Sequence, residues 1–499
     1  MAEFLRQLLA PGTKAPRWFT AVVVVLLTVA AWWYVTRAIQ HGTDVSNAID
    51  KKLAAERVHV FEDDPEAQTK AGRPLKAFDM NDQRVYMNYA QNLREHGIEQ
   101  FTTRMRMPMY MWLLALAVPG DLKMEPTLEA QRTFLEAFFP VARKFNVILS
   151  LVALVAMFFG LRGWLGNWLA VAFILIAAFQ LYMLKSPYVQ PEILLTTLIT
   201  VGTVWVVKTL HEPTWQNALI TGLILCVWHL TKANALVALG LMGLVMGLQL
   251  LCARDWPRRK AIVVAGLVTL AAYIVPMSPY LYTSYKIFGD PFHNVQSKYY
   301  MWAEDVDQKH VMQGMGLDRD LATVDKDGDG KIDNPDALPT AKNYWKQHSW
   351  EQIKKRFVKG ISMMFTNNYA EYTAIHWLQL MWVGILLWAA SRRWNEAVFG
   401  AWSWRWSILF LAAFLTVLVY LFGWFTPLKV GPRLLNSISL VPLFFCMSAT
   451  AYLLRRDSFK VGSWEVSSLK ALTLVFLAFW LVLTVLQLPN DLQNGYFAG

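Results

Sequence analysis

Two carboxylates in the first long polar segment have the chemistry of a general base. Asp79 and Asp82 lie in the segment 78–86, and apolar residues at helical spacing from position 85 onward predict an amphipathic helix that begins near Asp79. A carboxylate can take the proton from an acceptor hydroxyl as that hydroxyl attacks. Asp82 is the predicted base. In the structural alternative, Asp79 caps the helix and Asp82 favours the positive end of its dipole.

A third carboxylate, Glu192, opens an apolar run directly after Pro191. A proline and a carboxylate are both favoured in the first turn of a helix. Glu192 is therefore either a helix-start residue or a further acid at the site, and the sequence leaves both interpretations open.

Four cations lie beside or inside apolar runs, on the side of the chain that is expected to face outward. They are Arg104, Arg106, Lys232 and Arg433. Charge in or next to a membrane span is costly, so a functional role is the default hypothesis. Because arginine can grip a phosphate with two donors, these residues predict a site for the phosphate group of a lipid. The alternative is that they snorkel to the interface or form single salt bridges.

The segment 325–336 has the spacing of a calcium-binding loop, with carboxylates at positions 1, 3, 5, 9 and 12 and glycine at position 6. The predicted side-chain ligands are Asp325, Asp327, Asp329, Asp333 and Asp336, and Lys331 would supply its backbone carbonyl. Asp336 stands where glutamate is usual, so weak binding is expected. The predicted role of calcium is structural, and the alternative is an acidic, solvated loop.

The composition predicts that membrane helices position these residues. The chain has 499 residues, 55% hydrophobic and 17% charged, whereas soluble domains have about 25% charged residues. Many apolar runs are long enough to cross a bilayer. The net charge of +11 fits lysine and arginine in cytoplasmic loops, so no nucleic-acid partner is expected. The three cysteines lie in or at the end of apolar runs, and no disulfide is expected.

The predicted fold is an all-α polytopic membrane protein with about 11 spans. The first span is the run 18–36, read as an uncleaved helix behind a cytoplasmic tail. The other predicted spans are 137–160, 168–184, 193–208, 217–231, 235–252, 261–279, 375–391, 405–425, 434–453 and 470–487. Basic residues concentrate in the loops that this arrangement places in the cytoplasm, which favours a cytoplasmic N-terminus and an outer C-terminus.

Two large loops on the outer face are expected to form a cap of short helices. The predicted organisation is 1–36, N-terminal tail and first span; 37–107, first outer loop; 108–279, membrane helices; 280–374, large outer loop with the calcium segment; and 375–499, C-terminal membrane helices. In the large loop, apolar residues between Tyr344 and Ile361 form a stripe with Lys354, Lys355, Arg356 and Lys359 beside it. This pattern predicts an interfacial helix on the outer leaflet, which either guides an anionic lipid donor or anchors the loop.

Several short motifs together resemble the GT-C superfamily of integral-membrane glycosyltransferases, which use polyprenyl-phosphate sugars. The resemblance is nearest to bacterial transferases related to the protein O-mannosyltransferase and aminoarabinose transferase group, and it spans residues 1 to about 450. Its motifs are Asp82 with a downstream tyrosine, the segment 104–110 (Arg-x-Arg-x-Pro-x-Tyr), Pro191-Glu192, Thr231-Lys232-Ala233 and Gly431-Pro432-Arg433. The family usually has an Asp-Glu pair in the first outer loop. Gln83 follows Asp82 here, and either Asp79 or Glu192 could supply the second carboxylate.

This resemblance implies transfer of a sugar from a polyprenyl-phosphate donor to an acceptor lipid, glycan or protein on the periplasmic face of a bacterial inner membrane. Asp82 would be the base, and Lys232 and Arg433 would stabilise the departing phosphate. Such a donor is already activated, so no nucleotide cofactor is expected, and the sequence has no Walker or dinucleotide-binding motif. The alternatives are a transporter or flippase of lipid-linked saccharides, although no internal repeat is evident, and a structural membrane subunit.

Overall fold

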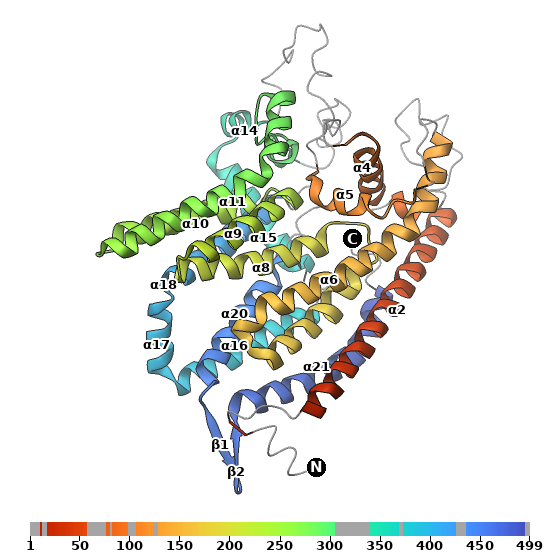
Figure 1. Cartoon of the computed structure of the whole chain (residues 1–499). Coiled ribbons are helices and arrows are strands. Elements are labelled where there is room, and N and C mark those ends of the chain that lie inside the picture. The colour runs from red at the N-terminus through yellow and green to blue at the C-terminus, as the bar shows by residue number, and fades with distance from the viewer. Residues whose placement is uncertain are drawn as a thin grey trace. The chain divides into compact units, whose positions relative to one another are not determined.

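The computed structural model of the chain describes residues 10–11, 17–56, 76–79, 82–97, 106–120, 122, 128–304, 339–368, 373–425 and 436–494. These residues are mostly helical (Figure 1). The chain divides into two compact units. The first comprises Met1–Glu95, Tyr110–Leu194 and Cys446–Gly499, and the second comprises His96–Met109 and Leu195–Phe445.

The first unit is built mainly from three long helices and the short elements between them. Its elements are α2 (Arg17–Glu56), η1 (Ala77–Asp79), α4 (Gln83–His96), most of α5 (Pro108–Ala115), α6 (Leu128–Ala177), η3 (Ala178–Tyr182), α7 (Met183–Lys185), β1 (Ser458–Val461), β2 (Trp464–Ser467) and α21 (Ser468–Asn494). The boundaries between the units fall within α4, at its last residue, and within α5, α8 and α20.

The second unit contains the helices of the middle of the chain. They are most of α8 (Glu192–His211), α9 (Trp215–Thr231), α10 (Ala235–Cys252), α11 (Trp256–Phe288), α12 (Val295–Lys298), η4 (Tyr300–Trp302), α14 (Ala341–Gln347), α15 (Trp350–Asn368), α16 (Thr373–Arg392), α17 (Trp394–Ser403), α18 (Arg405–Phe425) and the start of α20 (Leu440–Leu454).

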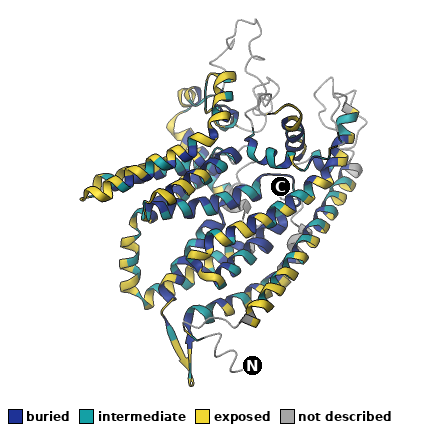
Figure 2. Cartoon of the chain, viewed as in Figure 1, coloured by how far each residue is buried: buried dark blue, intermediate teal, exposed yellow. Residues whose placement is uncertain are grey.

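The protein is a multi-pass membrane protein. Eight helices among the described residues are long and apolar enough to cross a membrane. Their surfaces are apolar as well. Exposed residues alternate with buried ones along α10 and α11 (Figure 2), and none of the described side chains of α2 before Tyr34 is buried. Only 11% of the most apolar stretch of α2 is buried, and Val25 and Trp32 are exposed. A soluble protein rarely exposes so much contiguous apolar surface, whereas lipid would cover it.

The prediction of about 11 spans differs from these eight helices for identifiable reasons. Residues Glu129–Lys185 count as one candidate span but contain two predicted spans, and the backbone breaks between them at Gly166 (φ 73°, ψ 164°). Glycine adopts this positive φ without the steric cost that a side chain brings. The predicted spans 217–231 and 375–391 coincide with α9 and α16, which are not among the eight.

Helix α2 continues through residues 37–56, part of the segment predicted to be the first outer loop. Polar contacts hold this half of the helix. Arg143 of α6 donates to the Gly42 carbonyl oxygen and, over 2.7 Å, to Ser46 Oγ. A Cβ on Gly42 would lie 2.7 Å from Cβ of Pro187, so glycine permits this close approach. Asp50 Oδ1 accepts a 2.7 Å hydrogen bond from the Ala77 amide, which ties η1 to α2.

A small antiparallel hairpin interrupts the predicted all-α fold. Strands β1 and β2 pair Phe459 with Val466 and Lys460 with Glu465, in a loop that was expected only to carry cytoplasmic charge. The turn contains Gly462 with φ of 60°. The sequence signal was available, since a Gly-Ser dipeptide between two alternating segments is typical of a two-residue hairpin turn.

Close packing of α9 on α11 forms much of the second unit's core. A Cβ on Gly222 would lie 2.6 Å from Cβ of Ala272 and would also collide with the Thr269 carbonyl oxygen. Small residues allow two helix backbones to approach in this way within a membrane. At the end of α9, the Tyr273 hydroxyl lies 2.8 Å from Nδ1 of the buried His229.

Candidate functional site

Asp82 occupies the junction between two short helical elements of the first unit. Helix α4 begins at Gln83, so the predicted helix start near Asp79 is four residues early. Asp79 instead ends the short helix η1. The Asp82 carbonyl oxygen accepts the first bond of α4, from the Tyr86 amide over 3.2 Å. The carboxylate of Asp82 is half-buried, at the positive end of the α4 dipole.

The backbone of Asp82 is left-handed, with φ of 66°, and it is the one described non-glycine residue with a positive φ. This conformation costs an L-residue about 1–2 kcal/mol, although aspartate and asparagine adopt it more readily than most. Such strain persists only where the surroundings enforce it, and it is concentrated at functional sites. The strain therefore marks Asp82 as a position whose geometry is imposed by its neighbours.

Gln83 is the main neighbour that fixes this junction. Its side chain is 3% exposed, and Nε2 donates to the Ala77 carbonyl oxygen over 3.0 Å. Oε1 accepts a 2.9 Å hydrogen bond from the Val189 amide. One amide side chain thus connects η1, α4 and the segment just before α8. Gln83 stands where the resembling family usually has a carboxylate. Its amide both donates and accepts a hydrogen bond, whereas an ionised carboxylate could only accept.

Aromatic and amide side chains extend this network from α4 to α6. The rings of Tyr86 and Tyr110 meet edge to face, with centroids 5.4 Å apart. The Tyr110 hydroxyl donates to Asn146 Oδ1 over 3.3 Å. Asn146 Nδ2 in turn donates to the Ser186 carbonyl oxygen over 3.0 Å and to the Tyr188 carbonyl oxygen. Helix α5 and the segment 186–188 are therefore both fastened to α6 through buried polar groups.

Glu192 belongs to the same neighbourhood. Burial raises the pKa of Tyr110 well above its usual value, and the negative charge of Glu192 raises it further. The Tyr110 hydroxyl therefore stays protonated and keeps its donor bond. Glu192 is the first residue of α8, which confirms its helix-start position, and its Oε2 atom is buried. Glu192 thus starts α8 and remains a candidate for the second acid of the site.

Asp79 is engaged in structural contacts. Its Oδ1 lies 3.4 Å from Nη1 of Arg84, and its Oδ2 accepts a 3.1 Å hydrogen bond from the Lys76 amide. Asp79 does not cap α4 as the structural alternative expected, because it ends η1 whereas α4 begins only at Gln83. Of the three predicted carboxylates, Asp82 has the strained backbone, Glu192 the tyrosine neighbour and Asp79 the ion pair.

Two of the predicted phosphate-binding cations are described, both in the second unit. Lys232 follows α9, and its extended backbone (φ −159°, ψ 131°) breaks the helix while its amide donates to the Trp228 carbonyl oxygen. Trp228 Nε1 donates to Asn234 Oδ1 over 2.9 Å and closes the break before α10. Arg106 is half-buried. It precedes Met107, whose sulfur accepts a hydrogen bond from the Tyr280 hydroxyl.

Several predicted site residues lie outside the described residues. They are Arg104, Arg433 and all six predicted calcium ligands, Asp325, Asp327, Asp329, Lys331, Asp333 and Asp336. Within the part of the chain that the structure describes, no cluster of three or more histidine, cysteine or acidic residues could hold a metal ion.

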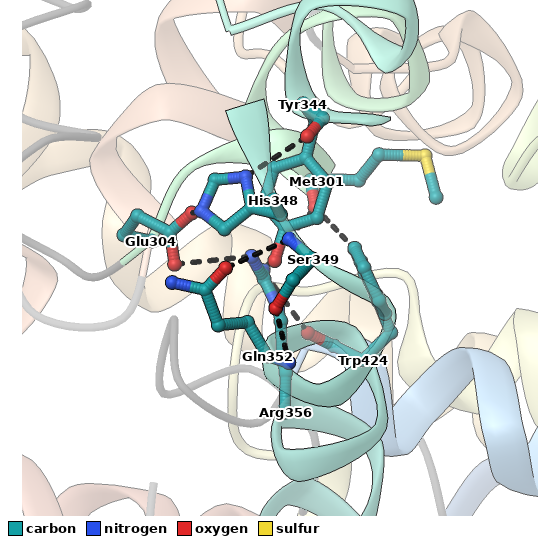
Figure 3. Close-up of polar contacts among 8 residues, drawn as sticks. All are labelled: Met301, Glu304, Tyr344, His348, Ser349, Gln352, Arg356 and Trp424. Carbon is teal, nitrogen blue, oxygen red and sulfur yellow. Dashed lines mark hydrogen bonds and ion pairs between the residues drawn. The ribbon is translucent and has the colours of Figure 1, made fainter. Parts of the chain in front are cut away.

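A second polar cluster, which was not predicted above, surrounds Arg356 in the second unit (Figure 3). Arg356 is only 7% exposed, although its helix was expected to place it among solvated lysines. Its Nη2 donates to the carbonyl oxygens of Met301 and Trp424, each over 3.3 Å. The guanidinium lies over the rings of Trp424 and Tyr344, at 4.3 and 5.3 Å from their centroids.

Glu304 and His348 complete the Arg356 cluster. His348 Nε2 lies 2.7 Å from Oε1 of Glu304, and Oε2 of the same carboxylate is 3.9 Å from Arg356 Nη1. The other histidine nitrogen, Nδ1, lies 2.9 Å from the Tyr344 carbonyl oxygen. Both ring nitrogens of His348 are thus engaged, and neither is available to a substrate (Figure 3). The cluster has the contacts of a structural clamp between η4, α14, α15 and α18.

No known protein-family profile matches the chain, and no curated protein matches it. The resemblance to GT-C glycosyltransferases therefore rests on the motifs quoted above. Chemically, the first unit offers a half-buried aspartate directly before a helix N-terminus, next in sequence to the buried amide side chain of Gln83. Such a group is suited to accept a proton from a hydroxyl.

Proposed function

We propose that the protein is a membrane glycosyltransferase that moves a sugar from a polyprenyl-phosphate donor to an acceptor at the outer face of the membrane. The observation that carries the proposal is Asp82, a predicted base whose left-handed backbone stands directly before Gln83, a buried side chain that bonds to both Ala77 and Val189. Backbone strain of this kind is concentrated at functional sites.

In the proposed reaction, the acceptor hydroxyl attacks the anomeric carbon of the donor sugar. The bond from that carbon to the phosphate oxygen breaks, and the lipid phosphate leaves with the electron pair. Asp82 accepts the hydroxyl proton. The proposal assigns Lys232 and Arg433, with Arg104 and Arg106, to the donor phosphate, where cations stabilise the charge that develops on the departing oxygen.

Product formation with purified protein tests this proposal. Full-length protein in detergent, incubated with a polyprenyl-phosphate monosaccharide and a cell-envelope extract as acceptor, should release one lipid phosphate for each sugar transferred. Mass spectrometry of the lipid and acceptor fractions measures both. Movement of intact lipid-linked sugar across proteoliposomes, without release of lipid phosphate, would instead support the transporter alternative and contradict the proposal.

We also propose that the segment 325–336 binds calcium in a structural role. If it does, protease cleavage between Gly314 and Thr340 should rise on chelation and fall when calcium is restored. Calorimetry should give a dissociation constant of roughly 10⁻⁴ to 10⁻³ M, because the side chain of Asp336 is short. Glycosyl transfer should fall partly and not vanish.

The matched control for the calcium proposal is Asp329→Asn with Asp333→Asn. This variant keeps the loop length and removes two of the proposed charged ligands. It should lose the calcium-dependent change in cleavage. No heat of binding to the wild-type protein at millimolar calcium would contradict the proposal.

A further inference from the structure

Helices α14 and α15 of the second unit present a cationic and aromatic face. Its exposed members are Lys342, Trp345 and Lys346 on α14, and Trp350, Lys354, Lys355, Val358 and Lys359 on α15. The two tryptophans are 50% and 68% exposed, respectively. Large aromatic residues are rarely left so open unless a partner or a membrane interface covers them.

The opposite face of α15 is fixed to the rest of the unit. Ile353 is 1% exposed and packs with Tyr344 and Trp424, and Arg356 joins the same cluster. One turn further on, Gly360 packs directly on the main chain of Gly423, where no side chain would fit. The direction in which the cationic face points is therefore set by buried contacts.

Those contacts place α15 at the end of a candidate membrane span. α18 (Arg405–Phe425) is one of the eight helices that can cross a membrane. α15 packs on its last two turns, through Phe357 against Tyr420 (5.9 Å between ring centroids) and against Trp424 (4.8 Å). The end of a membrane span lies at the depth of the lipid headgroups.

Helical spacing arranges the exposed side chains in two neighbouring ridges. Trp350, Lys354 and Val358 recur every four residues and form one ridge. Glu351, Lys355 and Lys359 form the next, one position further along. Apolar side chains beside ammonium groups are typical of a helix that lies in the membrane interface.

The charge of this face is strongly one-sided. Residues 341–368 contain five lysines and one carboxylate, Glu351. Among the described residues, none of the five lysine side chains forms a hydrogen bond or an ion pair. The other nearby carboxylate, Glu304, is turned toward His348 and Arg356 (Figure 3). Glu351 lies one turn before Lys354 and Lys355 and offsets one of the five lysine charges, so the face keeps a clear positive excess.

We propose that the α14–α15 face binds the headgroups of anionic phospholipids of the surrounding bilayer. Ammonium groups complement lipid phosphates, the tryptophans and Val358 enter the boundary between headgroups and acyl chains, and the packing on α18 holds the face at that depth. This inference does not depend on the proposed glycosyl transfer.

Lipid association measured by electron paramagnetic resonance tests the proposal. Full-length protein is reconstituted in phosphatidylcholine nanodiscs that contain a trace of spin-labelled phosphatidylglycerol or spin-labelled phosphatidylcholine. The immobilised fraction of each label gives the preference for the anionic lipid. The test variant is Lys354→Gln with Lys355→Gln and Lys359→Gln. The control, Arg254→Gln with Lys260→Gln and Lys460→Gln, removes the same number of exposed cations elsewhere.

The wild-type protein should prefer phosphatidylglycerol, and the test variant should reduce that preference at least about fivefold, since each lysine near an anionic surface contributes substantially to binding. The control should change it less than about twofold, because its cations are divided between two segments of the chain, whereas the test variant removes three lysines from one face. The wild-type preference should also fall as salt rises from about 0.05 M to about 0.5 M. This last measurement needs no variant.

Three outcomes would overturn the proposal. One is an equal loss in the test and control variants, which would show a general charge effect. Another is a wild-type preference that salt leaves unchanged. The third is an unchanged lipid preference in the test variant together with weaker use of a polyprenyl-phosphate donor, which would assign the face to the donor lipid.

Discussion

Asp82→Asn should lower the turnover of glycosyl transfer at least about a hundredfold, which is the lower end for loss of a general base. Asparagine has nearly the same shape and tolerates the left-handed backbone that position 82 adopts. The fold should therefore survive while the basic oxygen is lost. Release of lipid phosphate measures turnover, and thermal unfolding in detergent checks that the variant is folded.

Two conservative variants serve as controls for Asp82. Asp79→Asn removes only a partly exposed ion pair with Arg84, which contributes less than about 1 kcal/mol, so turnover should stay within about fivefold of wild type. Glu192→Gln probes the other candidate acid. If Asp82→Asn retains near-normal turnover while either of these variants abolishes it, the assignment of the base is wrong.

Gln83→Glu should destabilise the protein and should not raise activity, even though it restores the Asp-Glu pair usual in the resembling family. The introduced carboxyl would still accept the Val189 amide but, once ionised, would face the Ala77 carbonyl oxygen, and position 83 is 3% exposed. An unsatisfied buried polar group alone costs about 1–3 kcal/mol, and a buried charge costs more.

The destabilisation by Gln83→Glu should depend on pH with a definite sign. When protonated, the introduced carboxyl can donate its O–H to the Ala77 carbonyl oxygen, so folding should raise its pKa above the ordinary value for glutamate. A raised pKa stabilises the fold at low pH and loses that stabilisation as the pH rises through the folded-state pKa. Unfolding temperatures measured near about pH 5 and about pH 8 should therefore separate the variant from wild type mainly at the higher pH.

Gln83→Leu is the matched control, since it removes both hydrogen bonds and adds no charge. Its destabilisation should be the same at both pH values. A rise in turnover of Gln83→Glu with no loss of stability would show that position 83 serves as a second acid, contrary to its role in the structure.

The membrane helices could be predicted closely because each depends on a local pattern. The predicted spans 235–252 and 405–425 coincide with α10 and α18 to the residue. Long apolar runs bounded by polar residues determine both ends, and no distant partner is needed. The break between α9 and α10 was likewise marked by polar residues around Lys232.

The contacts that fix the candidate site could not be predicted in the same way. Gln83 bonds to Val189, 106 positions away in the sequence, and a single sequence gives no sign of such a pairing. Arg356 is a different case, because a signal existed. It lies three residues after Ile353 and four before Gly360, so helical spacing places all three on one face. Its charge led to the expectation of a solvated position, whereas Trp424 and two carbonyl oxygens cover it.

The Arg356 clamp joins two points of the chain that are far apart in sequence. The contact between Glu304 and His348 holds together the parts of the second unit that precede and follow residues 305–338 in the sequence. The entropy of closing a loop grows only slowly with its length, by about 0.6 kcal/mol for each doubling. Lengthening the connection between the two ends that this contact joins should therefore cost the clamped helices little folding free energy.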